Sequence, residues 1–225
     1  MVRKLALIIT AISAIFLAQQ SFAEMMATPV VQDTMPAPVT APVPVATPVI
    51  GQPAPAFTAM DTNGNEVSLE TLKGKVVVLE WTNHLCPFVV KHYGSGNMQS
   101  LQAKAKELGV TWVSIVSSAE GNQGYTTPEE ANAVMVEKGA TPAHRILDPQ
   151  GTIGHLYQAK TTPHMFVIDA EGILRYQGAI DDNPSPRQSA VDGATNYVLA
   201  AMTALTEGKA VEVAETRSYG CSVKY

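Results

Sequence analysis

From residue 51 onward, unbroken apolar runs alternate with stretches of helical period. The run Val76–Leu79 contains four apolar residues in succession, as expected for a strand that is buried on both faces of a sheet. A second buried strand is predicted over Thr111–Ser117. Residues 87–108 have a helical period that Gly94-Ser95-Gly96 interrupts, so we expect a kink or two helices there. The pattern predicts an α/β fold.

Turn and cap residues place the remaining elements. Asn63-Gly64 predicts the turn of an N-terminal hairpin between Pro55–Met60 and Glu66–Leu69. Thr127-Pro128-Glu129-Glu130 predicts a capped helix that ends at Gly139. Farther on we expect a strand at His144–Asp148 and a short helix at Gly151–Tyr157. A hairpin of two strands should follow at Thr161–Asp169 and Ile173–Gly178, and a closing helix at Ala194–Thr206. Residues 215–225 are expected to form an irregular tail.

Cys86 stands where the first buried strand gives way to a helix. Pro87 directly after it suits the first helical position, where the missing N–H has no cost. The partial positive charge of a helix N-terminus favours thiolate over thiol. Cys86 is therefore the candidate redox nucleophile, and the alternative is an inert core cysteine.

The two ends of the chain differ from its middle. Residues 1–23 carry Arg3 and Lys4, the apolar run Leu5–Ala18 and then small residues at 21 and 23, which indicates a secretory signal peptide. The run has 14 residues, fewer than the roughly 20 that span a bilayer, so we expect no stable membrane anchor after cleavage. Residues 24–50 are rich in proline and read as an extended linker. The folded domain is expected over 51–213, followed by a C-terminal tail at 214–225.

Composition limits the partners. The chain has 225 residues, 46% hydrophobic content and a net charge of −5, so it can build one core and has no basic surface for nucleic acid. Its two cysteines, Cys86 and Cys221, are too few for a disulfide framework but can form one bond. We expect no cofactor.

The order of elements and five motifs resemble the redoxin branch of the thioredoxin superfamily, the alkyl hydroperoxide reductase and thiol-specific antioxidant (AhpC/TSA) type, including its secreted peroxiredoxin-like members. The motifs are Gly51–Phe57, Leu72–Val76, Asn83–Phe88, Thr162-Pro163 before Phe166–Asp169, and Tyr219–Tyr225. The resemblance implies a thioredoxin fold with a central mixed sheet flanked by helices and an N-terminal β-hairpin extension. It also implies a cis peptide bond at Thr162-Pro163, against Cys86.

Two departures from the family pattern limit the chemistry. Thioredoxins carry a second cysteine three residues after the first, where this chain has Val89. Peroxiredoxins carry a threonine three residues before the cysteine, whereas Thr82 here lies four before it. A resolving cysteine must then come from Cys221 in the tail. The alternatives for Cys221 are a static disulfide with Cys86 or an unpaired thiol.

Other side chains near Cys86 have a functional and a structural interpretation. His84 is a candidate thiolate stabiliser, and Cys86, His84 and His164 together could ligate copper or zinc, although no metal site is the main expectation. Singly, His84, His92 and His164 are expected to be loop or surface residues, and Lys91 a surface lysine. Glu80 is expected to be a solvent-exposed carboxylate at the end of its strand. Trp81 and Phe88 are expected in the core rather than at a substrate rim.

The function expected from these features is that of an exported thiol-dependent oxidoreductase, periplasmic in a Gram-negative bacterium and otherwise secreted. Cys86 would attack a disulfide or a peroxide, and Cys221 or an external thiol would complete the cycle. The partners would be an electron-donor protein or a small thiol. Two other classes stay open, which are a metal-binding chaperone and a redox-inert module that binds peptides beside the cis-proline.

Overall fold

The computed structural model describes residues 47–225. The predicted signal peptide at 1–23 and nearly all of the predicted linker at 24–50 lie outside the described residues. Within 47–225, no helix has both the length and the apolar character that crossing a membrane requires.

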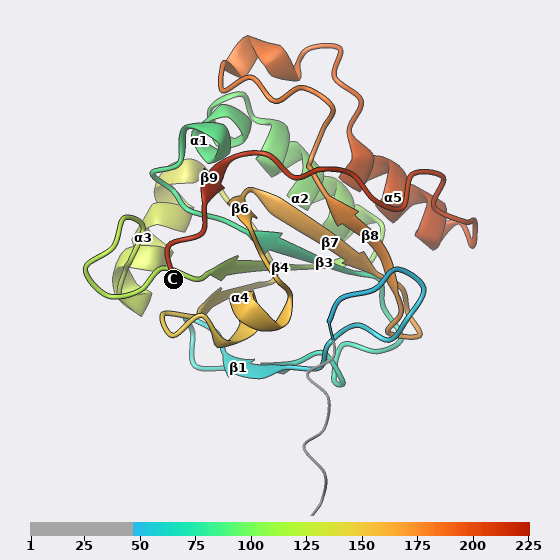
Figure 1. The fold of residues 1–225 in the computed structure, drawn as a ribbon, viewed down its shortest axis with the longest axis horizontal. Coiled ribbons are helices and arrows are strands. Elements are labelled where there is room, and N and C mark those ends of the chain that lie inside the picture. Colours follow the sequence, from blue (N-terminus) through green and yellow to red (C-terminus); the bar gives the residue numbers. More distant parts are fainter. Residues whose placement is uncertain (1–46) are drawn as a thin grey trace, which may run out of the picture. The chain divides into compact units, whose positions relative to one another are not determined.

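A mixed sheet of five strands forms the centre of the fold, in the order β5-β4-β3-β7-β8 (Figure 1). Strands β3 (Val77–Trp81), β4 (Thr111–Val116) and β5 (His144–Leu147) are parallel. Strands β7 (His164–Ile168) and β8 (Leu174–Gly178) run antiparallel to their neighbours. Strand β3 is central and all its residues are buried, as the unbroken apolar run predicts.

The helices follow the predicted boundaries within a few residues. They are α1 (Pro87–Gly94), α2 (Asn97–Glu107), α3 (Pro128–Lys138), α4 (Thr152–Leu156), the 3-10 turn η1 (Gln188–Val191) and α5 (Tyr197–Thr206). Gly96 has a φ of 76° and separates α1 from α2, so the interrupted helix is two helices. The predicted capping box is present, because the side chains of Thr127 and Glu130 each accept a hydrogen bond from the other residue's backbone N–H.

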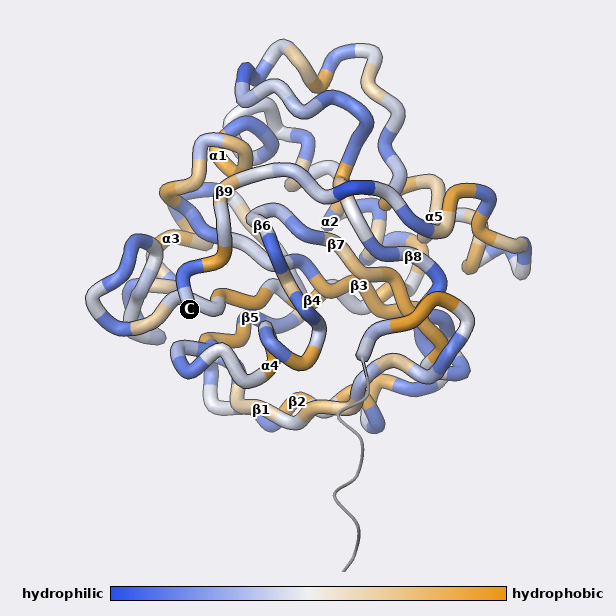
Figure 2. Tube along the Cα trace, viewed as in Figure 1, coloured by the Kyte–Doolittle hydropathy of each residue, from blue (hydrophilic) through white to orange (hydrophobic). Residues whose placement is uncertain are grey.

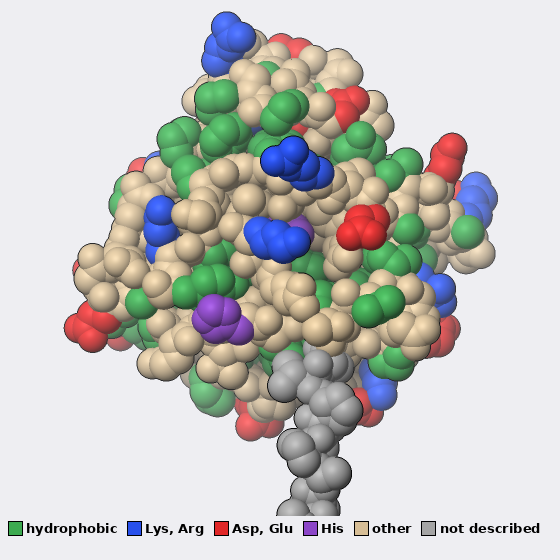
Figure 3. Space-filling model, in the orientation of Figure 1, with side chains coloured by type: hydrophobic (Ala, Val, Ile, Leu, Met, Phe, Trp, Pro, Cys, Tyr) green, Lys and Arg blue, Asp and Glu red, His purple; other side chains and the backbone are tan. Residues whose placement is uncertain are grey.

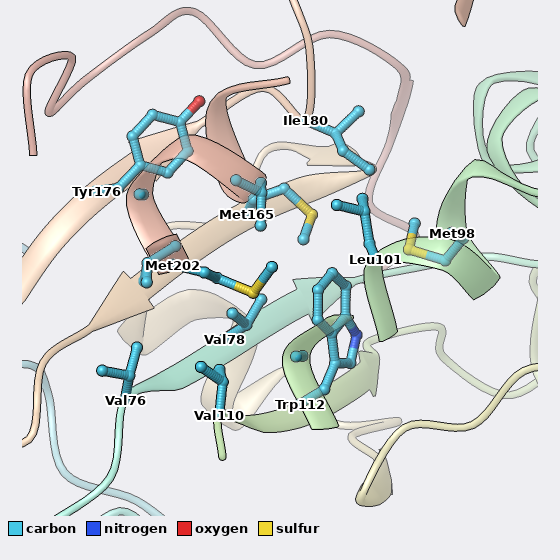
Figure 4. Packing of buried hydrophobic residues seen from close by; sticks show 14 of the residues in the cluster. Val76, Val78, Met98, Leu101, Val110, Trp112, Met165, Tyr176, Ile180 and Met202 are labelled. Atoms are coloured by element: carbon cyan, nitrogen blue, oxygen red, sulfur yellow. The ribbon is translucent and has the colours of Figure 1, made fainter. Parts of the chain in front are cut away.

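Two apolar layers cover the two faces of the sheet. Along β3 the side chains alternate, with Val76 and Val78 packed in one cluster and Val77 and Leu79 in the other. The first cluster holds side chains of α1, α2 and α5, and Figure 4 shows its interior. The second lies between the sheet, α4 and the N-terminal segment. The hydrophobic residues concentrate along the central strands (Figure 2).

A short hairpin precedes the central sheet. Strands β1 (Thr58–Met60) and β2 (Glu66–Ser68) pair antiparallel across a turn at Asn63-Gly64. The Asp61 carboxylate accepts hydrogen bonds from the backbone N–H groups of residues 63 and 65. Its Oδ2 also lies 2.9 Å from Nδ1 of His144, on β5. Asp61 therefore joins the hairpin to the edge of the sheet.

This carboxylate should make stability depend on pH. Burial acts to raise the pKa of Asp61, but hydrogen bonds from His144, Asn65 and Asn63 outweigh it and hold the pKa at about 2. A group whose pKa is lower in the folded state stabilises the fold above the unfolded pKa and loses that contribution as the pH falls. Between pH 5 and pH 2 the wild type should lose about 2 kcal/mol of stability through protonation of Asp61, and Asp61→Asn should not show this part of the loss. Urea unfolding at both pH values measures this, with the exposed Glu171→Gln as the control; equal pH dependence in the two variants would contradict it.

The C-terminal segment, residues 215–225, has little regular secondary structure, as the sequence predicts, but it makes specific contacts with the rest of the fold. Strand β9 (Cys221–Ser222) pairs antiparallel with β6 (Thr161–Thr162), with Cys221 opposite Thr162. Upstream, Thr216 N–H donates to the carbonyl of Gln177 on β8. The segment crosses the ends of the central strands toward the C-terminus (Figure 1). We call residues 215–225 the tail.

Candidate functional site

Cys86 is the N-cap residue of α1, with Pro87 at the first helical position. The strand before it ends at Trp81, and the Cys86 N–H donates to the carbonyl of Asn83 in a tight turn. The helix begins where Val90 N–H donates to the carbonyl of Cys86. This position beside the free amides of the first helical turn is the one that the sequence predicts. The side chain is fully buried.

The tail brings the second cysteine to the first. The Sγ atoms of Cys86 and Cys221 lie 2.9 Å apart, and both residues are free thiols. The Sγ of Cys86 also lies 3.0 Å from the carbonyl oxygen of Thr162. The two cysteines are 135 positions apart in the sequence, and the pairing of β9 with β6 brings them together. The structure thus places the predicted nucleophile and the predicted resolving cysteine in direct contact.

The surroundings of the two thiols shift their pKa values in opposite directions. Burial acts to raise the pKa of Cys86, but hydrogen bonds with the Cys221 thiol, with Thr162 and with the backbone N–H of Val89 outweigh it, and the pKa is lowered. The pKa of Cys221 is raised by burial, by the hydrogen bond to Cys86 and by the negative charge that Cys86 carries as a thiolate. Cys86 is therefore the thiol that ionises first and Cys221 the one that keeps its proton.

The loop beside the two cysteines contains the expected cis peptide bond, between Thr162 and Pro163. Thr162 is buried and pairs with Cys221 across β6 and β9. Gly220 has a φ of 140°, and a Cβ atom there would lie 2.1 Å from the carbonyl oxygen of Thr162. Only a glycine lets the tail approach this loop so closely. Gly220 thus belongs to the site, although its only signal in the sequence is its place before Cys221.

A buried ion pair holds the tail on the upstream side of Cys221. The Nζ of Lys91, on α1, lies 3.1 Å from Oδ2 of Asp181, and both side chains are at most 2% exposed. The hydroxyl of Tyr219 donates to Oδ1 of Asp181 and receives a hydrogen bond from Lys91 Nζ at 3.3 Å. Lys91 and Asp181 therefore hold the tail two residues before Cys221.

The expectation that Lys91 and His92 are surface residues is wrong. Neither side chain has exposed surface. A buried lysine needs a partner charge, and Asp181 supplies it from the loop after β8, 90 positions along the chain. His92 packs against the same group, with Nε2 3.2 Å from the Tyr219 hydroxyl. Burial lowers the pKa of His92 to about 4, so its imidazole is neutral at pH 7 and does not compete with Lys91 for Asp181.

Glu80 is also buried, which contradicts the expectation of a solvent-exposed carboxylate. The strand continues to Trp81, so Glu80 lies within the sheet and has no exposed surface. Oε2 accepts hydrogen bonds of 2.8 Å from both Trp112 Nε1 and the Ser114 hydroxyl, and Oε1 accepts one of 3.3 Å from the Tyr93 hydroxyl. Its polar atoms are thus satisfied within the core.

The predicted histidines do not gather around Cys86. His84 lies in a narrow hollow with Arg145 and Lys138. Burial, and then the charges on these two residues, lower its pKa, which weakens its case as a cationic thiolate stabiliser. His164 is buried and packs on Phe166. Cys86, His84 and His164, all among the described residues, do not form a group that could hold a metal ion.

The aromatic residues that flank Cys86 have different surroundings. Trp81 is fully buried, packs against Tyr157 and Phe166, and donates from Nε1 to the Ser117 hydroxyl at 3.0 Å. It is a core residue, as expected. Phe88 is half-buried and its ring centroid lies 5.7 Å from that of Tyr219. Phe88 therefore contacts the tail as well as the core.

This fold and this arrangement of thiols define a thioredoxin-like redoxin. The family model described as AhpC/TSA matches residues 50–177, more than half of the 225 residues, and the chain belongs to the AhpC/TSA family. No curated protein matches the chain.

Solved structures include two that are similar over most of their length. A hypothetical protein from Sinorhizobium meliloti 1021 is 25% identical, with 79% of this chain and 94% of that chain covered and a TM-score of 0.67. An uncharacterized conserved protein from Geobacillus kaustophilus is 28% identical, with 79% and 92% covered and a TM-score of 0.68. The thioredoxin domain of a thiol-disulfide oxidoreductase from Bacteroides vulgatus is 22% identical, with 64% and 96% covered and a TM-score of 0.47.

Proposed function

We propose that this protein is an exported thiol-disulfide oxidoreductase with a two-cysteine cycle. The observation that carries the proposal is the 2.9 Å contact between Cys86 and Cys221, in which the helix-capping thiol has the lowered pKa. Export is supported by the sequence features of residues 1–23. The contact supports Cys221 as a resolving thiol over an unpaired one.

The cycle has two exchange steps. The Cys86 thiolate attacks one sulfur of a substrate disulfide, forms a mixed disulfide and releases the other substrate sulfur as a thiolate. Cys221 then loses its proton and attacks the Cys86 sulfur, which releases the second substrate thiol and leaves a Cys86–Cys221 disulfide. The substrate gains two electrons and the cysteine pair loses them. Two thiols, from a dithiol donor protein or from two small-molecule thiols, then reduce the Cys86–Cys221 disulfide in two exchange steps and are themselves oxidised to a disulfide.

The roles of the two cysteines are tested by trapping. We expect Cys221→Ser, mixed with a disulfide-containing peptide, to accumulate a mixed disulfide on Cys86, because the second exchange step has no thiol. The wild type should instead form the intramolecular disulfide without a lasting adduct. Mass spectrometry of acid-quenched, non-reduced samples distinguishes the two species. A Cys221→Ser variant that turns over like the wild type would exclude Cys221 as the resolving thiol.

The same variant separates disulfide from peroxide substrates. Hydrogen peroxide followed by a sulfenic-acid trap should leave Cys86 unlabelled in Cys221→Ser if disulfides are the substrate class. Labelling at stoichiometric peroxide would make peroxide the substrate and would leave the two-cysteine cycle in place.

A further inference from the structure

A second hollow lies beside the tail, between residues 215–218, β6 and the end of α4. Its volume is about 620 Å³, within the range of small-molecule sites. It is lined by Pro48, the end of α4, the residues around β6, Gln177 on β8, and the tail from Glu215 to Ser218. Basic side chains gather at the centre of this face (Figure 3). We call this hollow the tail pocket.

Several polar side chains that line the tail pocket already have partners within the protein. The pairs are the Tyr157 hydroxyl with the Pro55 carbonyl at 2.7 Å, the Thr161 hydroxyl with the Pro163 carbonyl at 3.0 Å, the Thr216 hydroxyl with the Tyr176 hydroxyl at 2.7 Å, and the Glu215 carboxylate with Gln177 Nε2 at 2.9 Å. The acidic residue of the lining is therefore held by a neutral amide.

The donors of the lining that have no partner within the described part of the chain are on Gln158, Ser218 and three basic side chains. The side chains of Lys160 and Arg217 make no hydrogen bond or ion pair with any described protein group. His164 is buried, and its Nδ1 accepts a hydrogen bond from the backbone N–H of Lys160 at 3.3 Å. Burial lowers the pKa of His164 to about 4, so the neutral ring carries its proton on Nε2. That N–H has no protein partner among residues 47–225, and His164 lines the pocket, so the N–H can donate to a molecule bound there.

We propose that the tail pocket binds a small organic molecule that carries a carboxylate, with Arg217, Lys160 and His164 Nε2 as its donors. The two basic side chains outnumber the one carboxylate of the lining, that of Glu215, so the lining has a net positive charge, which favours an anion. A carboxylate offers two oxygens, which match the two parallel N–H groups of a guanidinium. The volume exceeds what an inorganic ion fills, so the rest of the molecule is organic.

A ligand bound in the tail pocket would also hold the tail in its closed position, which goes beyond the proposed function. Lys160 directly precedes β6, whereas Arg217 belongs to the tail. The two like charges disfavour close approach of these segments, and an anion bound to both would join them. The bound state then keeps the tail, and with it Cys221, closed on β6.

Binding is tested on the full-length chain by isothermal titration calorimetry with succinate, at constant ionic strength. We expect saturable binding that Arg217→Gln and Lys160→Gln each weaken about tenfold, the loss of one charge-assisted hydrogen bond. Lys75→Gln is the matched control, because Lys75 is exposed and does not line the pocket. Neutral succinamide should give no heat. Absence of saturable succinate binding, or equal weakening by Lys75→Gln, would overturn the proposal, as would binding of inorganic phosphate but not of succinate.

A second measurement monitors the tail. In Cys86→Ala, whose remaining cysteine is Cys221, succinate should slow alkylation by iodoacetamide several-fold, and Arg217→Gln should abolish that protection. Protection that persists in Arg217→Gln would contradict a link through this residue. Neither measurement needs exchange activity, so failure of the tail pocket and failure of the two-cysteine cycle are distinguishable.

Discussion

Asp181→Ala is expected to destabilise the protein by about 3–5 kcal/mol, the usual effect of leaving one partner of a buried ion pair alone. Lys91 has no exposed surface and lies 3.1 Å from this carboxylate, so the variant would leave an ammonium group in the core. Ordinary domains have a total stability of about 5–15 kcal/mol. The variant should therefore lose a large part of its stability, measured by urea unfolding at pH 7.

A matched pair of controls separates charge burial from general damage. Glu207→Ala breaks the exposed ion pair with Lys209 and should cost less than about 1 kcal/mol. The double variant Lys91→Met with Asp181→Leu removes both buried charges and should recover much of the loss. A double variant as unstable as Asp181→Ala would show that packing or the hydrogen bond to Tyr219, and not the lone charge, causes the effect.

Cys86→Ser is expected to abolish disulfide reduction, with the rate falling to that of the reaction without protein. A serine hydroxyl keeps its proton at neutral pH, so the helix N-terminus that favours the thiolate has no anion to stabilise. The measurement is the release of thiol from a disulfide-containing peptide. Cys86→Ala serves as a second variant, since it avoids placing a hydroxyl at this buried position.

Cys221→Ser is the informative comparison for this loss. It retains the nucleophile and should release one equivalent of thiol in a burst before it stops, because the mixed disulfide is not resolved. Residual turnover in both Cys86 variants would contradict the assignment of Cys86 as the nucleophile. Circular dichroism on each variant confirms that the fold is intact.

The local features of the site can be predicted from the sequence because short stretches determine them. Four apolar residues in a row require a strand covered on both faces, and β3 is that strand. Proline after Cys86 places the cysteine at a helix start, which is where it lies. In the same way Gly96 ends the continuity between α1 and α2.

The contacts around the site cannot be predicted from short stretches, because they join residues that lie far apart in the sequence. The sequence around Lys91 is that of a surface lysine. Its buried partner, Asp181, lies on the loop after β8, and only the folded structure brings the two together. The sequence predicts Glu80 at a strand end, but the strand continues for one more residue and Glu80 lies in the core. The docking of the tail depends on Tyr219 and Gly220, whose partners lie on other elements.

The complete burial of Cys86 beneath the tail makes its reaction with a substrate depend on movement of the tail. Thr162 and Cys221 both contact its sulfur, so an incoming disulfide reaches that sulfur only after β9 has separated from β6. Opening and attack are then sequential, and the slower of the two governs turnover. If opening of a tail held by the buried pair of Lys91 and Asp181 is the slower step of the proposed cycle, substrates of quite different reactivity would be processed at one common rate.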